Sequence, residues 1–316
     1  MIPDLVERIA QAERLIRPHI RETPVVPSLA LSEATGADVW FKCENLQVTG
    51  SFKARGATHR LLSLPEDVRG RGVVAASSGN HGIGVAYAGH ALGIPVTVYV
   101  PDFVSPAKAA AMRRLGATVT VFGIDGLDTE LEARCVADAN RQAYVSPYND
   151  WSVVAGQGTV GVELRRQVAN IGTVIVAVGG GGLIGGIAAY LKHHAPNVNV
   201  IGAQPANSNV MIESMRAGHV VEIPSSPTLS DGTAGGIEAN TVTFALCQSV
   251  VDDWIEIDEG EIATAMRHAI EVEHMLIEGS AGVAIAALKR RGALTGRVVV
   301  VLCGANVSAA RLREVL

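Results

Sequence analysis

The sequence has 316 residues, of which 48% are hydrophobic, 18% charged and only 4% aromatic, and 34 are glycines. This aliphatic, glycine-rich composition in a chain long enough for a sizeable core excludes disordered, fibrous and disulfide-scaffold proteins. The net charge of −5 and the pI near 6.0 argue against nucleic acid or an anionic membrane as a partner.

Strand-like and helical patterns alternate along the chain. Helices are predicted at 5–20, 81–92, 106–115, 129–141, 153–168, 183–193, 261–273 and 281–290. Strands are predicted at 38–42, 72–76, 96–100, 118–121, 173–178, 199–203 and 297–302. Strands that alternate with helices of this length indicate βαβ units and parallel sheets, so we predict an α/β fold.

The segment 171–191 contains no charged residue and is long enough to span a bilayer. Glycines cluster in its middle, so we interpret it as a strand, a loop and a buried helix, with no membrane partner. The N-terminus is an amphipathic, charged helix rather than a secretory signal. The four cysteines form no CxxC pair. Free thiols and a cytoplasmic location are therefore predicted.

Four successive glycines, Gly179, Gly180, Gly181 and Gly182, stand between a predicted strand and the helix that opens at Leu183. Without Cβ atoms, several backbone N–H groups can point at one anion above a helix N-terminus. The spacing is not GxGxxG, and no acidic residue ends the next strand in the expected register. The run therefore favours a single phosphate over a dinucleotide, with a flexible turn as the alternative.

A second strand-to-helix junction reads SSGNH, from Ser77 and Ser78 through Gly79 to Asn80 and His81. Ser and Asn are favoured helix caps, so capping alone is one interpretation. The density of small polar donors at the same end of the sheet favours a site for a carboxylate. Taken alone, His81 is more typical of a structural histidine than of a catalytic one.

Lys53 opens a third helix, within the sequence GSFKARGA. The positive end of the helix dipole repels an ammonium group and lowers its pKa, which suits a Schiff-base nucleophile. An exposed surface lysine is the alternative.

The ordered set of motifs resembles the serine/threonine dehydratase and serine racemase branch of the tryptophan-synthase-β-like pyridoxal phosphate (PLP) enzymes. The set comprises GSFKARGA, SSGNHG, GGGGL and LCGAN, with AGQGTVGVEL, TLSDG and EGSAG between them. The resemblance implies PLP as cofactor, a homodimer and a two-lobed fold. Its large lobe would comprise residues 1–69 and 145–316, and its small mobile lobe residues 70–144. Residues 228–239 are also similar to the hydroxyectoine-utilisation and phenylserine dehydratase groups.

The resemblance also implies roles for individual residues. Lys53 would form the Schiff base with the cofactor and then act as the base at the substrate's α-carbon. The loop Ser77–His81 would bind the substrate carboxylate. In racemases, the hydroxyl at the position of Ser78 serves the face of the α-carbon opposite the lysine. The remaining cofactor contacts would be Phe52 beside the ring, Asn80 at its 3′-oxygen, Gly179 to Leu183 at the phosphate and Cys303 at the pyridine nitrogen.

A thiol at the position of Cys303 has chemical consequences. It is a weak donor and a poor counter-ion for a pyridinium, so it favours elimination over transamination. A buried small hydrophobic residue is the alternative for Cys303. Glu278, in EGSAG, is predicted near the cofactor, with a surface role for Glu278 or helix capping at Ser280 as alternatives.

No metal site is predicted. Some members of this branch bind a divalent cation through carboxylates after the strand that follows the glycine loop. Gln204 and Val210 stand at the corresponding positions here, and they lack the charged oxygen ligands that hard cations prefer.

The predicted reaction is removal of water from a small β-hydroxy amino acid, such as serine or threonine, which yields a 2-oxo acid and ammonia. An amino-acid racemase and a β-replacement synthase share the fold and stay open as alternatives. A non-catalytic PLP-binding protein and a nucleotide-binding protein are more distant ones.

Overall fold

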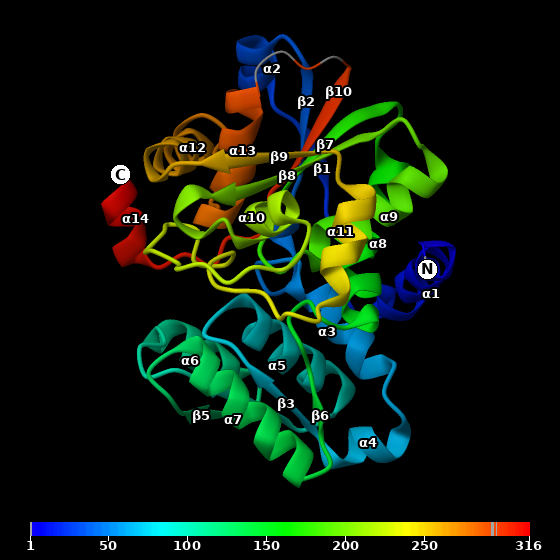
Figure 1. The fold of residues 1–316 in the computed structure, drawn as a ribbon, viewed down its shortest axis with the longest axis vertical. Coiled ribbons are helices and arrows are strands. Elements are labelled where there is room, and N and C mark those ends of the chain that lie inside the picture. The colour runs from blue at the N-terminus through cyan, green and yellow to red at the C-terminus, as the bar shows by residue number, and fades with distance from the viewer. Residues whose placement is uncertain (1, 292–293, 295) are drawn as a thin grey trace.

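The computed structural model describes residues 2–291, 294 and 296–316, and it contains two sheets. Figure 1 shows the larger sheet in the upper half of the molecule and the smaller one in the lower half. The large sheet has the strand order β1-β2-β10-β7-β8-β9, and the small sheet has the order β5-β4-β3-β6. All neighbouring strands pair in parallel except β1 and β2. This arrangement confirms the predicted α/β class.

The strands of the large sheet are β1 (Val25–Pro27), β2 (Asp38–Lys42), β7 (Ile171–Ala177), β8 (Asn199–Pro205), β9 (Asp253–Ile257) and β10 (Arg297–Val301). Those of the small sheet are β3 (Val73–Ala76), β4 (Val96–Val100), β5 (Thr118–Val121) and β6 (Ala143–Tyr144). All four strands of the small sheet thus lie between residues 73 and 144. The predicted mobility of residues 70–144 stays a prediction.

The helices before the small sheet are α1 (Ile2–Ile16), α2 (Leu29–Thr35), α3 (Lys53–Leu62) and α4 (Glu66–Arg71). Within and after it follow α5 (Asn80–Leu92), α6 (Pro106–Arg114), α7 (Gly126–Ala139), α8 (Trp151–Gln167), α9 (Gly182–His194) and α10 (Val210–Ala217). The chain continues through α11 (Val242–Val250), α12 (Glu259–Glu271), α13 (Gly279–Arg291) and α14 (Ala309–Val315). Three short 3-10 helices complete the list: η1 (Arg17–His19), η2 (Glu44–Leu46) and η3 (Ala206–Ser208).

The inner strands of both sheets, β3, β4, β7, β8 and β10, are largely buried and form separate hydrophobic cores with the helices around them. The uncharged segment 171–191 divides into β7, a glycine turn and α9, as predicted. No helix in the described part of the chain is long and apolar enough to cross a membrane.

The carboxyl ends of four parallel strands lead directly into the four motifs. β2 leads to the segment before Lys53, β3 to the loop 77–79, β7 to the glycine run and β10 to Leu302–Asn306. Ligands in open α/β sheets bind at this end of the strands, so the topology gathers the motifs at one place.

Candidate active site

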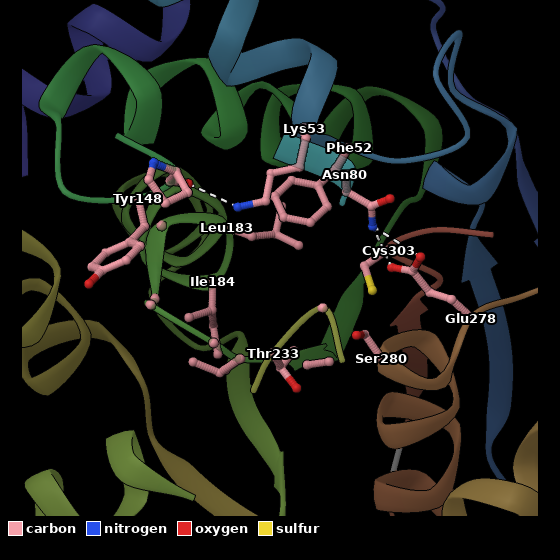
Figure 2. Close-up of a pocket in the computed structure, with 18 residues that line it drawn as sticks. Phe52, Lys53, Asn80, Tyr148, Leu183, Ile184, Thr233, Glu278, Ser280 and Cys303 are labelled. Atoms are coloured by element: carbon pink, nitrogen blue, oxygen red, sulfur yellow. Dashed lines mark hydrogen bonds between the residues drawn. The ribbon is translucent and has the colours of Figure 1, made fainter. Parts of the chain in front are cut away.

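A cavity lies at the boundary between the two sheets, where the loops after these strands meet. Figure 2 shows Lys53 and Phe52 on one side of it, with Tyr148 and Ile184 on a second side and Cys303 and Ser280 on a third. A neighbouring cavity is lined by the loop from Ser77 to His81, and both cavities share Lys53, Asn80 and Glu278. The predicted cofactor and substrate residues therefore surround two compartments that meet at Lys53.

Backbone contacts between distant segments place Lys53 beside Cys303. Phe52 N–H donates a hydrogen bond to the Cys303 carbonyl at 3.1 Å, and Ser51 forms an isolated antiparallel bridge with Gly304. From the other side, α5 packs closely against α3 at Gly84, where an added Cβ would lie 3.0 Å from the Lys53 carbonyl carbon. The start of α3 is therefore held between the two sheets.

A buried ion cluster fixes the first turn of α3. The Arg55 guanidinium donates to Glu44 at 2.7 Å and to Glu163 on α8 at 2.7 Å, and Lys42 also pairs with Glu163. The side chains of all four residues are fully buried. Burial alone would raise the pKa of Glu163, but Arg55 and Lys42 outweigh burial and lower that pKa to about 2. The cluster is thus charged, and removal of one partner would leave an uncompensated buried charge.

Burial favours the neutral form of Lys53. It lowers the pKa of the ammonium group to about 8, although Cys303 and Glu278 beside it act in the opposite direction. Lys53 Nζ donates to the Pro147 carbonyl at 2.9 Å and lies 5.1 Å from the centre of the Phe52 ring. Lys53 is partly buried and borders the cavity shown in Figure 2, so it is not a freely exposed surface lysine, and its catalytic role stays a prediction.

The glycine run forms an open turn above the N-terminus of α9. Gly181 adopts a φ of +82°, which L side chains rarely tolerate, and no side chain caps the helix. A Cβ on Gly180 would lie 2.2 Å from Cγ of Tyr148. The first N–H groups of a helix lack intrahelical partners, and the helix dipole adds positive potential there. The turn therefore has the properties of an anion-binding site.

The loop 77–81 leads into the uncapped N-terminus of α5, which begins at Asn80. Ser77 Oγ accepts a hydrogen bond from Gly79 N–H at 3.1 Å, and Ser78 lines the second cavity. His81 is buried, which lowers its pKa to about 3, and its Nε2 lies 2.7 Å from the Val145 carbonyl. A neutral ring must donate to that carbonyl, so the side chain of His81 has a structural role.

Cys303 lies at the end of β10, and its side chain faces the first cavity. The residue is 3% exposed, and burial raises the pKa of its thiol well above the usual value. Cys303 is therefore a neutral thiol. A neutral thiol is a weak hydrogen-bond donor and carries no charge with which to hold a cation.

Glu278 also borders both cavities, although it is only 3% exposed. Its carboxylate accepts hydrogen bonds from Asn80 Nδ2 at 2.7 and 3.0 Å. The alternative of a surface role for Glu278 is therefore wrong. Capping by Ser280 is wrong as well, because α13 already begins at Gly279, and the Ser280 hydroxyl accepts from Ser230 Oγ at 3.2 Å.

Gln204 and Val210, which stand where some relatives have metal-binding carboxylates, take part in hydrogen bonds and packing within the protein. Gln204 Nε2 donates to the Val178 carbonyl, Gln204 Oε1 accepts from Ile212 N–H, and Val210 is buried. In the described part of the chain no group of three His, Cys, Asp or Glu residues could hold a metal ion. The absence of an activating metal stays a prediction.

Several residues that line the cavities were not predicted. Tyr148 and Thr233 line the first cavity with the glycine run, and Lys108 and Asp231, which form an ion pair at 3.1 Å, line the second. Asp231 lies within the quoted motif TLSDG, which was a signal for it. Tyr148 and Lys108 carry no local sequence signal of this kind.

Comparison with known proteins defines the class first. Residues 16–304 match the family described as pyridoxal-phosphate dependent enzymes, so the chain belongs to that family. A putative threonine dehydratase of Sinorhizobium fredii is 38% identical over 98% of this chain and 95% of that protein. The processed form of threonine deaminase isoform 2 from Solanum lycopersicum superimposes with a TM-score of 0.92 at 30% identity, covering 99% of this chain and 92% of that one.

Maize serine racemase superimposes with a TM-score of 0.91 at 29% identity, over 98% of this chain and 95% of the other. Together these relatives confirm the predicted tryptophan-synthase-β-like fold, the PLP cofactor and the dehydratase and racemase branch. The chain is a PLP-dependent lyase of the dehydratase type.

The residues of the first cavity fit this cofactor. A Cβ at Gly180 would overlap the Tyr148 ring, so only glycine lets this ring pack against the turn above α9. An uncapped helix N-terminus suits a phosphate, and a lysine whose pKa is lowered to about 8 suits an aldehyde, because more of its amine is neutral than in an ordinary lysine. A neutral thiol is compatible with an unprotonated ring nitrogen.

Proposed function

We propose that this protein eliminates water from a small β-hydroxy amino acid, with threonine or serine as the first candidates, and releases a 2-oxo acid and ammonia. The observation that supports it best is the junction of the two compartments at Lys53. One compartment offers an anion site at the glycine turn before α9, and the other offers a loop suited to a carboxylate. An amino acid held by its carboxylate would present its amino group and α-carbon to the lysine.

When bound, PLP supplies an aldehyde for amino groups and a ring that withdraws electrons from the α-carbon of an amino acid. Burial lowers the pKa of Lys53 to about 8, so its Nζ carries the nucleophilic lone pair mainly above that pH, and the neutral amine would then take the proton from the α-carbon of the substrate. The Pro147 carbonyl, 2.9 Å away, orients the amine.

The other residues bind and orient. Backbone N–H groups from Gly179 to Leu183 would hold the phosphate, and the start of α5 with Ser77, Ser78 and Gly79 would hold the substrate carboxylate. Cys303 would face the ring nitrogen as a neutral thiol, Phe52 would pack beside the ring and Asn80 would contact its 3′-oxygen.

Racemisation is the second candidate, because Ser78 lines the substrate compartment together with Lys53. In the racemases that this chain resembles, a serine at this position serves the face of the α-carbon opposite the lysine. Both reactions begin with removal of the α-proton, and they differ in whether the β-hydroxyl leaves or a proton returns. A β-replacement synthase would instead need an added thiol or sulfide.

A substrate panel tests the proposal. The purified holoenzyme is incubated with serine, threonine, phenylserine, hydroxyaspartate and hydroxyectoine-derived amino acids, and 2-oxo acid, ammonia and enantiomer content are measured. We expect equal amounts of 2-oxo acid and ammonia from at least one of them without added thiol, and none from the Lys53→Ala variant. Change of enantiomer without ammonia would favour a racemase, and product only with added thiol would favour a synthase.

We also propose a homodimer, with residues 70–144 moving as a small lobe over the active site. Both proposals rest on the similarity to the dehydratase and racemase branch. Light scattering of the purified protein should give twice the 32.9 kDa of one chain. A mass of one chain at all working concentrations would contradict the dimer.

A further inference from the structure

Three residues form a closed hydrogen-bonded ring across the boundary between the two sheets, through their side chains and one backbone N–H. Asn80 belongs to α5 beside the small sheet, whereas Glu278 precedes α13 and Asn306 follows β10. Asn80 Nδ2 donates to both oxygens of Glu278, Asn306 Nδ2 donates to Asn80 Oδ1 at 2.7 Å, and Asn306 N–H donates to Glu278 Oε2 at 3.1 Å. Figure 2 shows Asn80 turned toward Glu278 at the edge of the cofactor cavity.

The ring allows only one orientation of the Asn80 amide. Its nitrogen faces a carboxylate, which accepts hydrogen bonds, and its oxygen faces the amide nitrogen of Asn306, which donates. Asn306 is itself oriented, because its Nδ2 also donates to the Thr49 carbonyl at 2.9 Å. A flipped Asn80 would direct its oxygen at a carboxylate and its N–H groups at another donor.

The carboxylate of Glu278 packs closely against the backbone at Gly304. An added Cβ at Gly304 would lie 2.6 Å from Glu278 Oε1, and the Glu278 N–H donates to the Gly304 carbonyl at 3.0 Å. Burial raises the pKa of Glu278, whereas the hydrogen bond from Asn80 acts in the opposite direction. The carboxyl group is thus a fixed acceptor placed against Asn80.

We propose that Glu278 is a positioning residue that acts through Asn80, holding one N–H of its amide toward the cofactor ring. The inference rests on the proposed cofactor site. One N–H can serve both oxygens of a single carboxylate, so the second N–H of Asn80 Nδ2 is left for a ligand in the cavity that Asn80 lines. Glu278 belongs to the large-sheet side and Asn80 to α5 beside the small sheet, so the hydrogen bonds between them also join α5 to the large-sheet side of the cavity.

Glu278→Gln tests this role. The glutamine keeps one acceptor oxygen but turns an NH₂ group toward either Asn80 or Asn306, so the single orientation of Asn80 is lost. We measure the PLP dissociation constant by titrating the apoprotein, together with its melting temperature. Glu273→Gln is the matched control, because Glu273 is also nearly buried and accepts from Ser28 and His268 away from both cavities.

A double-mutant cycle with Asn80→Ala separates action through Asn80 from any other role. We expect Glu278→Gln to weaken PLP binding about tenfold or more in the wild-type background and less than about twofold in the Asn80→Ala background. The Glu273→Gln control should leave the dissociation constant within about twofold of wild type even if it lowers the melting temperature.

An equal loss of affinity in both backgrounds, or no loss in the wild type, would overturn the inference. If Glu278→Gln does not fold, Asn306→Ala removes the donor on the other side of Asn80 and should show the same non-additivity. Failure of the cofactor site itself looks different, because the wild-type protein would then bind PLP no better than Lys53→Ala.

Discussion

Burial favours the uncharged forms of the two reactive side chains that face the first cavity. It lowers the pKa of Lys53 and raises that of Cys303. A neutral amine is a nucleophile and a base, whereas a neutral thiol cannot act as the counter-ion of a protonated ring nitrogen. The pair therefore suits elimination, in which the electrons of the broken C–H bond expel the β-hydroxyl.

Replacement of Cys303 by Asp or Ser should separate these effects. Asp would keep the ring nitrogen protonated and strengthen the ring as an electron sink, so we expect elimination to slow by about tenfold or more and transamination to increase. Ser is also uncharged and should stay within a few-fold of wild type. Rates of 2-oxo acid and pyridoxamine phosphate formation check this, and an Asp variant that eliminates as fast as wild type would make Cys303 a packing residue only.

The positions of Lys53 and the glycine run at the cavity could be predicted because each belongs to a short motif whose chemistry is local, whereas that of Cys303 could be predicted only from the family resemblance. Tyr148 could not, because it reaches the cavity only where Gly180 lacks a Cβ, and that contact joins two distant segments. The partner of Glu278 was missed for the same reason, since Asn80 lies 198 positions away in the sequence.

At the scale of elements, long periodic segments were predicted well and short ones were not. The helix predicted at 5–20 is α1, which ends at Ile16 because Pro18 interrupts the hydrogen-bond pattern and the chain continues as η1. Strands β1 and β6 have only three and two residues, which is too few to show the alternation of apolar and polar residues that predicts a strand. β9 is longer, and its alternating DWIEI sequence was a signal that was not used.

The turn between β7 and α9 should tolerate no side chain at Gly180. Gly180→Ala places a Cβ 2.2 Å from the Tyr148 ring, so either the ring or the turn must shift, and we expect PLP affinity to fall by about tenfold or more. Gly236→Ala is the matched control, because its Cβ meets nothing within 4 Å. Titration of both apoproteins with PLP checks this, and equal affinities would show that the turn does not hold the phosphate.

At the scale of the whole molecule, the segment between α10 and α11 runs along the boundary between the two halves (Figure 1). Ion pairs join it to helices beside the small sheet, Lys108 with Asp231 at 3.1 Å and Arg134 with Glu238 at 3.0 Å. The parallel strands and their alternation with helices could be predicted from the sequence. These ion pairs could not, because each joins charged residues that are more than 100 positions apart in the sequence.

The central claim is that Lys53 carries the cofactor and the chemistry. The most direct measurement compares visible absorbance and ammonia release for PLP-loaded wild type, Lys53→Ala and Lys192→Ala, in which a half-buried lysine paired with Asp252 away from both cavities is removed instead. Wild type and Lys192→Ala should be yellow and active, whereas Lys53→Ala should lose the yellow colour and at least about a thousandfold in turnover. A Lys53→Ala protein that folds and keeps both its colour and its turnover would contradict the account.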